Sequence, residues 1–440
     1  MGSLRPPSIA GNDKALDRLI GDIRSGNCVA FVGAGFVAPA VPQWRELLGK
    51  LNKAAPKTAR DMVSGLIATG SSAQDLETAA QLLRDAMPER RFQALLQKSV
   101  STKKQSKVAD RLTWLRGIPF RSILTTNFDP LIAGDVPGRD AYLKVLRSES
   151  SQWTDDRFWR GVPKGADVVK LHGDVARKAD AQIVFSRQDY RKLLHGNPAY
   201  LTFLRSVFAT RTVFYFGFSF TDAYLDELRS EILALLEHRD GVPIAYTIGS
   251  NVSVERQRYY RKHEGLEILS YKSEGGDFAG FDDYLRTIHD ETNPLARLGL
   301  ILEGKRILWL DKNKENNDDG MRLLRKAAKK RCKFAPHANW ESAVKEVRRA
   351  QSAGEPYDLL ITHWGHAQET LDGSVCAVAE RVLTEIRKGA AGLPAIVFAS
   401  RDHANENKRR ALRLGAAAFT FEWPHLFREI ERVFAPATAE

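Results

Sequence analysis

The sequence predicts an α/β protein with two domains: a Rossmann-like parallel sheet that carries a helical insertion, and a second, smaller doubly wound domain. The chain has 440 residues, which is about three times the length of a typical domain. Short apolar runs alternate along it with longer amphipathic stretches. Several of these runs are apolar at nearly every position, which is typical of parallel strands buried on both faces.

The first domain is expected over residues 1–295. Its candidate strands are the apolar runs at 28–32, 122–125, 168–171, 183–185, 212–217, 244–248 and 266–269. Between the first two runs, over about residues 45–115, the pattern changes to amphipathic helices without strands. The simplest interpretation is a helical insertion between the first two strands of the sheet.

Residues 296–304 are expected to form a linker, and residues 305–440 the second domain. The expected strands lie at 306–310, 358–362, 395–399 and 417–421, and the expected helices at 320–330, 376–387, 408–415 and in a last helix that ends near Val433. Strands and helices that alternate in this way over about 135 residues are typical of a small doubly wound domain.

Composition narrows the class of protein. Hydrophobic residues make up 43% and charged residues 27%, as in ordinary folded domains. Three cysteines are too few for a disulfide framework, which favours a reducing compartment. No apolar run is long enough to span a membrane, and the first residues lack an apolar signal core. A cytoplasmic protein without a membrane partner is therefore expected.

The formal net charge of +12 raises the question of an acidic partner. Residues 1–304 and 305–440 each carry +6, so the basic surplus is not concentrated in a tail. A local cluster, RKAAKKRCK at 325–333, is interpreted as a solvated helix face, with contact to a polyanion or an acidic partner as the alternative. Nucleic acid is expected only through a partner.

A glycine-rich turn follows the first candidate strand. In CVAFVGAGFVAP, Gly33 and Gly35 flank Ala34 and allow the backbone to pass close to a phosphate, to which the next helix can present free amides. Taken alone this turn is weak evidence, because such glycines often serve only the turn. Three more segments follow other candidate strands: TTNFDPLI at 125–132, KLHGD at 170–174 and YFGFSFTD at 215–222. Because open α/β sheets bind ligands at the carboxyl ends of their strands, the four segments predict one ligand site.

These segments together resemble the sirtuin-like fold that consumes NAD. They are most similar to the bacterial branch of NAD-hydrolysing effectors in antiphage defence, in which GAG is followed by P-x-W-x-E-L-L. Here these motifs are GAG at 33–35 and PQWRELL at 42–48. The resemblance covers about residues 15–290, with the motifs in the family's order.

The resemblance implies roles for particular residues. The catalytic positions, which hold the nicotinamide ribose and act on its hydroxyls, are matched by Asn127, Asp129 and His172. The positions that bind the rest of the nucleotide are matched by Gly33, Ala34, Gly35, Thr126, Gly217 and Ser219. NAD would then be the substrate.

The residue types suit cleavage of the nicotinamide–ribose bond, whose oxocarbenium-like transition state needs a held ribose and a placed water. Asn127 can bond both a hydroxyl and a water. His172, expected to titrate near neutrality, can draw a proton from a ribose hydroxyl. Asp129 would favour the developing positive charge or anchor the sugar.

Each of these residues also has a plain structural interpretation. His172 can be a satisfied histidine at a strand end, and Asn127 and Asp129 can form an Asx turn that caps a helix before Pro130. Ser219 can cap the helix that follows it, and this role can coexist with a nucleotide contact.

The sequence also departs from part of the family pattern. Sirtuin deacylases carry a zinc ribbon between the HG strand and the G-x-S strand, but residues 174–214 contain no cysteine. No metal is therefore expected, and lysine deacylation is disfavoured. The favoured function is that of an NAD glycohydrolase, which releases nicotinamide and ADP-ribose. The alternative is a non-catalytic sensor or scaffold that binds NAD or an ADP-ribose-type nucleotide within a defence complex.

The second domain resembles the receiver domain of two-component signalling. Asp311 and Ser400 are kept, but Lys312 replaces the second acid, His363 stands at the phosphoacceptor position and Trp423 stands where lysine is expected. One acid is too few for a Mg²⁺ site. The resemblance implies a degenerate regulatory or oligomerisation domain, so a homo-oligomer and an activating protein partner or nucleotide signal are expected.

Overall fold

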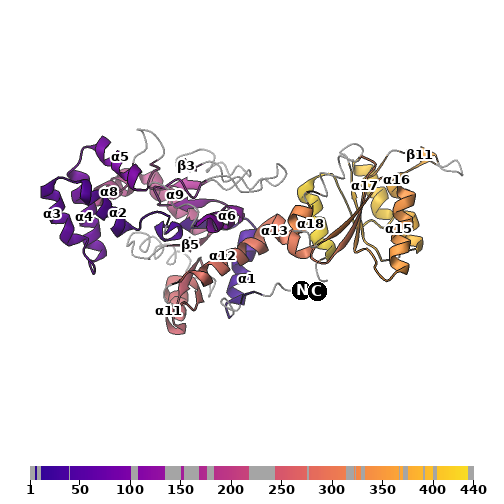
Figure 1. Ribbon diagram of the computed structural model, residues 1–440, viewed down its shortest axis with the longest axis horizontal. Coiled ribbons are helices and arrows are strands. Elements are labelled where there is room, and N and C mark those ends of the chain that lie inside the picture. Colours follow the sequence, from indigo (N-terminus) through magenta and orange to yellow (C-terminus); the bar gives the residue numbers. More distant parts are fainter. Residues whose placement is uncertain are drawn as a thin grey trace. The chain divides into compact units, whose positions relative to one another are not determined.

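The computed structural model in Figure 1 forms two compact units, which divide between Thr292 and Asn293. The structure describes residues 5–6, 11–38, 40–100, 108–133, 150–152, 168–175, 183–217, 243–274, 277–313, 322, 324–328, 332–365, 367–369, 375–389, 392–399 and 404–434. No helix within these ranges is both long enough and apolar enough to cross a membrane.

A seven-stranded parallel sheet forms the centre of the first unit. Its spatial order is β3 (Ser150–Gln152), β4 (Val168–Lys170), β2 (Ile123–Thr125), β1 (Cys28–Val32), β5 (Thr212–Phe216), β6 (Ala245–Ser250) and β7 (Leu266–Tyr271). All neighbouring strands are parallel. Apart from the added edge strand β3, this is the classic Rossmann order. The predicted fold class of the first domain is confirmed.

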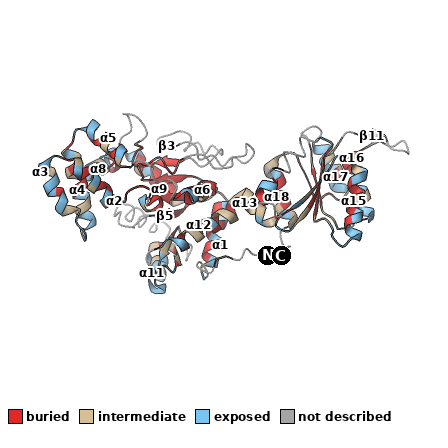
Figure 2. Ribbon diagram, viewed as in Figure 1, coloured by how far each residue is buried: buried red, intermediate tan, exposed pale blue. Residues whose placement is uncertain are grey.

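Each face of this sheet packs against its own hydrophobic core, because successive side chains of a strand point to opposite faces. In β1, Cys28, Ala30 and Val32 join one core, whereas Val29 and Phe31 join the other. The first core includes helices α1 (Asp13–Arg24) and α12 (Ala279–Thr292), and the second includes α8 (Arg187–Gly196) and α9 (Pro198–Thr210). Figure 2 shows the buried strands between helices whose outer faces are exposed. Helix α11 (Val254–Glu264) contacts β7 without burying any residue.

The predicted helical insertion lies between β1 and β2. It comprises α2 (Trp44–Ala54), α3 (Lys57–Leu66), α4 (Ala73–Asp85), α5 (Glu89–Ser99) and α6 (Ala109–Gly117). Helices α2 to α5 gather at one end of this unit, beside α8 (Figure 1). Ser72 and Asp75 form a capping box that satisfies free amides at the start of α4.

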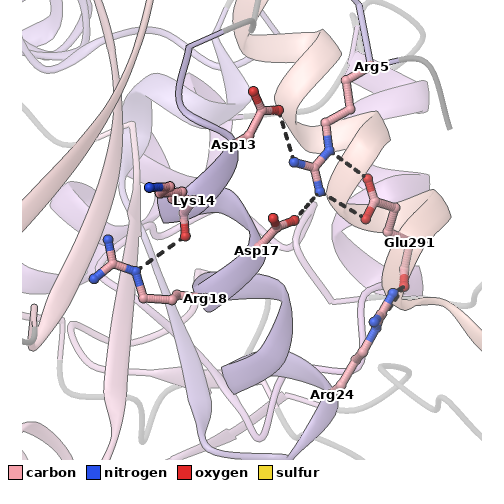
Figure 3. Close-up of polar contacts among 7 residues, drawn as sticks. All are labelled: Arg5, Asp13, Lys14, Asp17, Arg18, Arg24 and Glu291. Carbon is pink, nitrogen blue, oxygen red and sulfur yellow. Dashed lines mark hydrogen bonds and ion pairs between the residues drawn. The ribbon is translucent and has the colours of Figure 1, made fainter. Parts of the chain in front are cut away.

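An arginine near the start of the chain connects α1 to α12. Arg5 donates hydrogen bonds to Asp13 and Asp17 of α1 and to Glu291 of α12 (Figure 3). Arg24, at the end of α1, donates to the main-chain carbonyl of Glu291. These contacts hold the first and last helices of the unit together.

The second unit contains a five-stranded parallel sheet. Its order is β14 (Ala418–Thr420), β13 (Ala395–Phe398), β10 (Leu359–Thr362), β8 (Arg306–Leu310) and β9 (Lys333–His337). In chain order this is 5-4-3-1-2, the flavodoxin-like doubly wound order, so the fold class predicted for the second domain is confirmed too. One face packs on α13 (Pro294–Ile301) and α18 (Trp423–Phe434). The other packs on α15 (Trp340–Ser352), α16 (Val378–Gly389) and α17 (Ala404–Arg413). A small antiparallel pair joins β11 (Ala367–Glu369) to β12 (Val375–Ala377).

Several elements differ from the expectation. Residues 183–185, predicted as a strand, are not in one; Phe185 is buried against Trp44 and Phe92 of the insertion, so their apolar character reflects loop packing. Strands β3 and β9 and helix α15 were not predicted. The range 296–304, expected as a linker, contains most of α13, whose Leu298 belongs to the core of the second unit.

Candidate functional site

The strand ends that carry the predicted motifs are neighbours in the first sheet. Val32 at the end of β1 pairs with Thr125 of β2 on one side and with Phe216 of β5 on the other. Thr125 in turn pairs with Lys170 of β4. The glycine turn and the segments that follow β2, β4 and β5 therefore start at one edge of the sheet, on both sides of the point where the strand order reverses. This is where open α/β sheets bind ligands.

The glycine turn packs directly against the turn that follows β5. The Gly33 amide donates to the Phe216 carbonyl at 2.8 Å, and the Gly35 amide donates to the Gly217 carbonyl at 3.1 Å. Gly217 has a φ of +64°, and a Cβ atom there would lie 2.2 Å from the Phe36 nitrogen. Only glycine fits this close approach of two backbones.

This packing changes the expected use of the turn. The next helix was expected to present free amides to a phosphate, but the glycines lead into a short 3-10 helix, η2 (Ala34–Val37), and α2 begins only at Trp44. Because the Gly33 and Gly35 amides bond to the end of β5, these two glycines act by bringing backbones together. A pyrophosphate contact at this turn stays a prediction.

Asn127 lies between the ends of β1 and β2. The Thr125 hydroxyl donates to the Val32 carbonyl at 2.7 Å and accepts a bond from the Asn127 amide at 3.1 Å. The Asn127 side chain donates to the Gly33 carbonyl at 3.3 Å. Its Oδ1 atom is buried and accepts no hydrogen bond from the described part of the chain. A buried oxygen left in this state is costly unless a ligand or water bonds to it.

Asp129 lies in the same loop as Asn127, close to Lys170 at the end of β4. Asp129 is 2% exposed, and its Oδ1 accepts a bond from the Leu131 amide at 2.9 Å. The structure thus contains the Asx turn, but no helix begins between Pro130 and Ala133. Burial raises the pKa of the Asp129 carboxyl, while the Lys170 ammonium and two backbone amides act to lower it and the Asp174 carboxylate acts to raise it further.

His172 follows β4, with its ring edge-on to Tyr190 of α8 at a centroid distance of 5.5 Å. Its carbonyl accepts a bond from the Val184 amide at 3.0 Å. Burial lowers the pKa of the imidazole from 6.5 to about 4, so the expectation that it titrates near neutrality is wrong. The ring is neutral at pH 7, which is the form that can accept a proton.

Sequence reasoning missed two buried cations that bond to the loop after β2. Lys170 donates to the main-chain carbonyls of Asn127 and Asp129. Arg116 of α6 donates to the carbonyls of Leu131, Ile132 and Ala133. The only signal in the sequence is a basic residue inside an otherwise apolar stretch, such as the lysine of VVKL.

The helical insertion reaches the same edge of the sheet through aromatic rings. The Phe185 ring lies 4.9 Å from Trp44, 4.8 Å from Phe92 and 6.1 Å from Phe128 between centroids. Phe128 belongs to the loop that also carries Asn127 and Asp129. The insertion therefore supports this loop, in part through the packing of Trp44 on Phe185.

The other predicted positions are placed only in part. Thr126 is half-buried beside Asn127, and Ala34 is exposed in the glycine turn. Ser219 lies outside the described residues. No group of three or more His, Cys, Asp or Glu side chains suited to a metal occurs among the residues that the structure describes.

Near the carboxyl ends of the strands in the second sheet, several side chains bond to or stack on neighbours within the unit. His363 Nδ1 donates to the Leu310 carbonyl at 3.1 Å, and Asp311 accepts a bond from the Asn313 amide at 2.8 Å. Trp423 stacks on Trp309, with centroids 6.1 Å apart. Ser400 lies outside the described residues.

Residues 121–269 match the family model described as a SIR2-like domain. This SIR2-like region includes the loops that carry Asn127, Asp129 and His172. The chain is also similar to curated proteins. It is 29% identical over 221 residues to the NAD(+) hydrolase ThsA of Acinetobacter baumannii, covering 49% of this chain and 41% of that protein. It is 24% identical over 254 residues to the NAD(+) hydrolase ThsA of Cytobacillus dafuensis, covering 57% and 47%.

A more distant relative is the Defense-associated sirtuin 2 of Bacillus subtilis, which is 21% identical over 258 residues, covering 57% of this chain and 24% of that protein. The chain therefore spans less than half the length of each of these three relatives. Among solved structures, the chain is similar to a response regulator receiver domain protein from Clostridium thermocellum. The identity is 15% and the TM-score 0.24, with 30% of this chain and 94% of that chain covered.

Proposed function

We propose that this chain is an NAD glycohydrolase that cleaves NAD to nicotinamide and ADP-ribose as an effector of bacterial antiviral defence. The observation that carries the proposal is the buried Oδ1 of Asn127, which has no hydrogen-bond partner among the residues that the structure describes. It is held beside the glycine turn at the sheet edge that also bears His172. The relatives named NAD(+) hydrolase ThsA support NAD as the substrate.

Asn127, His172 and Asp129 have different roles in the cleavage. Asn127 presents an acceptor oxygen that can bond a ribose hydroxyl or the attacking water. The neutral His172 accepts a proton from a ribose hydroxyl or, through it, from water. Asp129, buried and next to Lys170, contributes negative charge where positive charge develops on the sugar. Positioning of the ribose supplies most of the rate enhancement.

The test is nicotinamide release from NAD by the full chain and by two variants. Asn127→Ala and His172→Ala should each abolish the release while the protein stays folded, because both residues act at the reacting ribose. Asn52→Ala is the matched control: Asn52 is also a buried asparagine with an unpartnered Oδ1, but it lies in α2. It should keep full turnover. Undiminished release by either site variant, at matched thermal stability, would falsify these assignments.

A second candidate function is nucleotide sensing without turnover. Binding of NAD with no nicotinamide release by the wild-type chain, alone and with candidate activating partners, would select it.

We also propose that the second unit regulates the first. The regulator is expected to act in a cytoplasmic homo-oligomer that responds to a protein partner or a nucleotide signal, with nucleic acid acting only through a partner. Light scattering and an NAD turnover assay on residues 1–292 and on the full chain test this, because a regulatory unit should change the oligomer mass or the response of turnover to the activator. Identical behaviour of the two chains would contradict it.

A further inference from the structure

Lys170 is a buried cation with an unusual set of partners. The residue is 3% exposed, at the end of β4, and its Nζ atom lies 3.1 Å from the Asn127 carbonyl oxygen and also bonds to the Asp129 carbonyl oxygen. Burying an ammonium group costs free energy unless hydrogen bonds and opposite charge compensate. The hydrogen bonds that Lys170 donates to these carbonyls offset part of the cost of burying its charge.

These bonds add to a main-chain connection between the same two loops. The Leu171 amide donates to the Thr125 carbonyl at 2.9 Å, and the Val175 amide donates to the Phe128 carbonyl at 3.2 Å. In the same loop, the carbonyls of Asn127 and Asp129 accept hydrogen bonds from the Lys170 ammonium. The segment that bears Asn127 is therefore held against the segment that bears His172.

Arg116 holds the next part of the loop in a similar way. It is 8% exposed and donates to the carbonyls of Ile132 at 3.2 Å and Ala133 at 3.0 Å, and also to that of Leu131. Arg116 contacts the far end of the loop, whereas Lys170 contacts the end that carries Asn127 and Asp129. A substitution of Arg116 therefore serves as a comparison for one of Lys170, because both residues bond to the loop but only Lys170 bonds to the part that carries Asn127 and Asp129.

We propose that Lys170 is a positioning residue for NAD cleavage, which fixes Asn127 and Asp129 relative to His172 through its two carbonyl bonds. This inference rests on the proposed function. The geometry has an electrostatic consequence, because Lys170 acts to lower the pKa of the Asp129 carboxyl against the effects of burial and of the Asp174 carboxylate. Loss of the ammonium should therefore move protonation of Asp129 to higher pH.

The experiment compares Lys170→Met, Lys170→Arg and Arg116→Gln in the full chain. Lys170→Met should lower kcat about 10- to 100-fold with a smaller change in KM, because displaced groups weaken the reacting geometry. It should also move the acid limb of kcat/KM to higher pH. Lys170→Arg keeps the charge and both carbonyl bonds, so it should restore most of the rate and the original limb. Arg116→Gln should leave the limb unmoved. An unmoved limb in Lys170→Met, or an equal loss in folded Lys170→Arg, would overturn the proposal.

Amide hydrogen exchange separates this inference from the proposed function, since it needs no turnover. In Lys170→Met the Leu131 amide, which bonds to Asp129, should exchange faster than in the wild type. If the wild-type chain releases no nicotinamide, the proposed function fails, and the exchange result alone decides whether Lys170 positions the loop. Unchanged exchange in Lys170→Met would refute the positioning role. If Lys170→Met does not fold, Lys170→Arg is compared with the wild type in the same way. Faster exchange of the Leu131 amide in Lys170→Arg would also count against the role.

Discussion

Burial decides the protonation state of His172, the predicted base. Its ring lies against Tyr190, and burial lowers the pKa of the imidazole to about 4. The residue type alone indicated a histidine that titrates near neutrality, since the sequence shows no packing around the ring. The identity of the residue was therefore predictable and its charge was not.

The first prediction concerns the pH dependence of turnover. Because His172 stays neutral until the pH approaches about 4, it should cause no inflection of kcat/KM near pH 6.5, and its protonation should lower kcat/KM only in more acidic solution. The Asp129 carboxyl, whose pKa burial raises, contributes to the same acid limb. An NMR titration of the His172 ring assigns its share, and a midpoint above about 6 would contradict the burial effect.

The same pKa shift makes stability depend on pH. Between pH 6.5 and about 4 the unfolded chain binds a proton on His172 that the folded chain does not, so the free energy of unfolding should decrease as the pH falls. His172→Gln lacks this proton, and its urea midpoint should fall less between pH 7 and pH 5 than that of the wild type. Equal falls in the two proteins would show that the ring titrates normally.

Among the site residues, sequence analysis found those that a motif defines and missed those that bond to the main chain. Asn127, Asp129 and His172 follow adjacent parallel strands, so their convergence could be predicted from the order of the strands. The bonds of Lys170 and Arg116 go to carbonyl groups, which every residue has. A pattern of side chains in the sequence therefore cannot indicate which carbonyl groups Lys170 and Arg116 will bond to.

At the scale of elements, the central strands and the edge strands β7 and β14 were predicted, whereas the edge strands β3 and β9 were missed. β1, β2, β4 and β5 are mostly apolar and are buried along their whole length, which leaves a clear pattern. β9 reads KFAPH, with no fully buried residue and a proline that an edge position tolerates, and β3 reads SSQ. Both lie at sheet edges, where short polar strands are usual.

The second prediction tests the contact between the two glycine turns. Gly217→Ala places a Cβ atom 2.2 Å from the Phe36 nitrogen, at a φ of +64°. Gly26→Ala is the matched control, since its φ is +73° and nothing lies within 4 Å of its added Cβ. Gly26→Ala should cost about 1 kcal/mol of backbone strain. Gly217→Ala should cost clearly more in urea unfolding and should weaken NAD binding. Equal costs would mean that the turns are not held in contact.

At the scale of the whole molecule, the alternation of apolar runs and helices was enough to predict two parallel sheets, but not the helix α13 within the expected linker. NPLARLGLILEGK was interpreted as a short segment that leads to the second alternating unit, with residues 296–304 as a linker. Its partners lie far along the chain: α13 packs on α18, and Arg297 lies 3.4 Å from Glu431. A contact over such a sequence separation leaves no local signal.

The third prediction therefore assigns α13 to the second unit. Leu298 and Leu302 are fully buried in its core, so a fragment of residues 293–440 should be more stable to urea than one of residues 305–440, which leaves that surface of the core uncovered. Two substitutions on this helix test the same point in the full chain. Leu298→Ala should cost about 2–5 kcal/mol, because it removes buried methyl groups and leaves a cavity. Leu300, on the same helix, is 40% exposed, so Leu300→Ala should change the unfolding free energy by less than about 1 kcal/mol. Equal midpoints for the two fragments, together with equal costs for the two substitutions, would return α13 to the role of a linker.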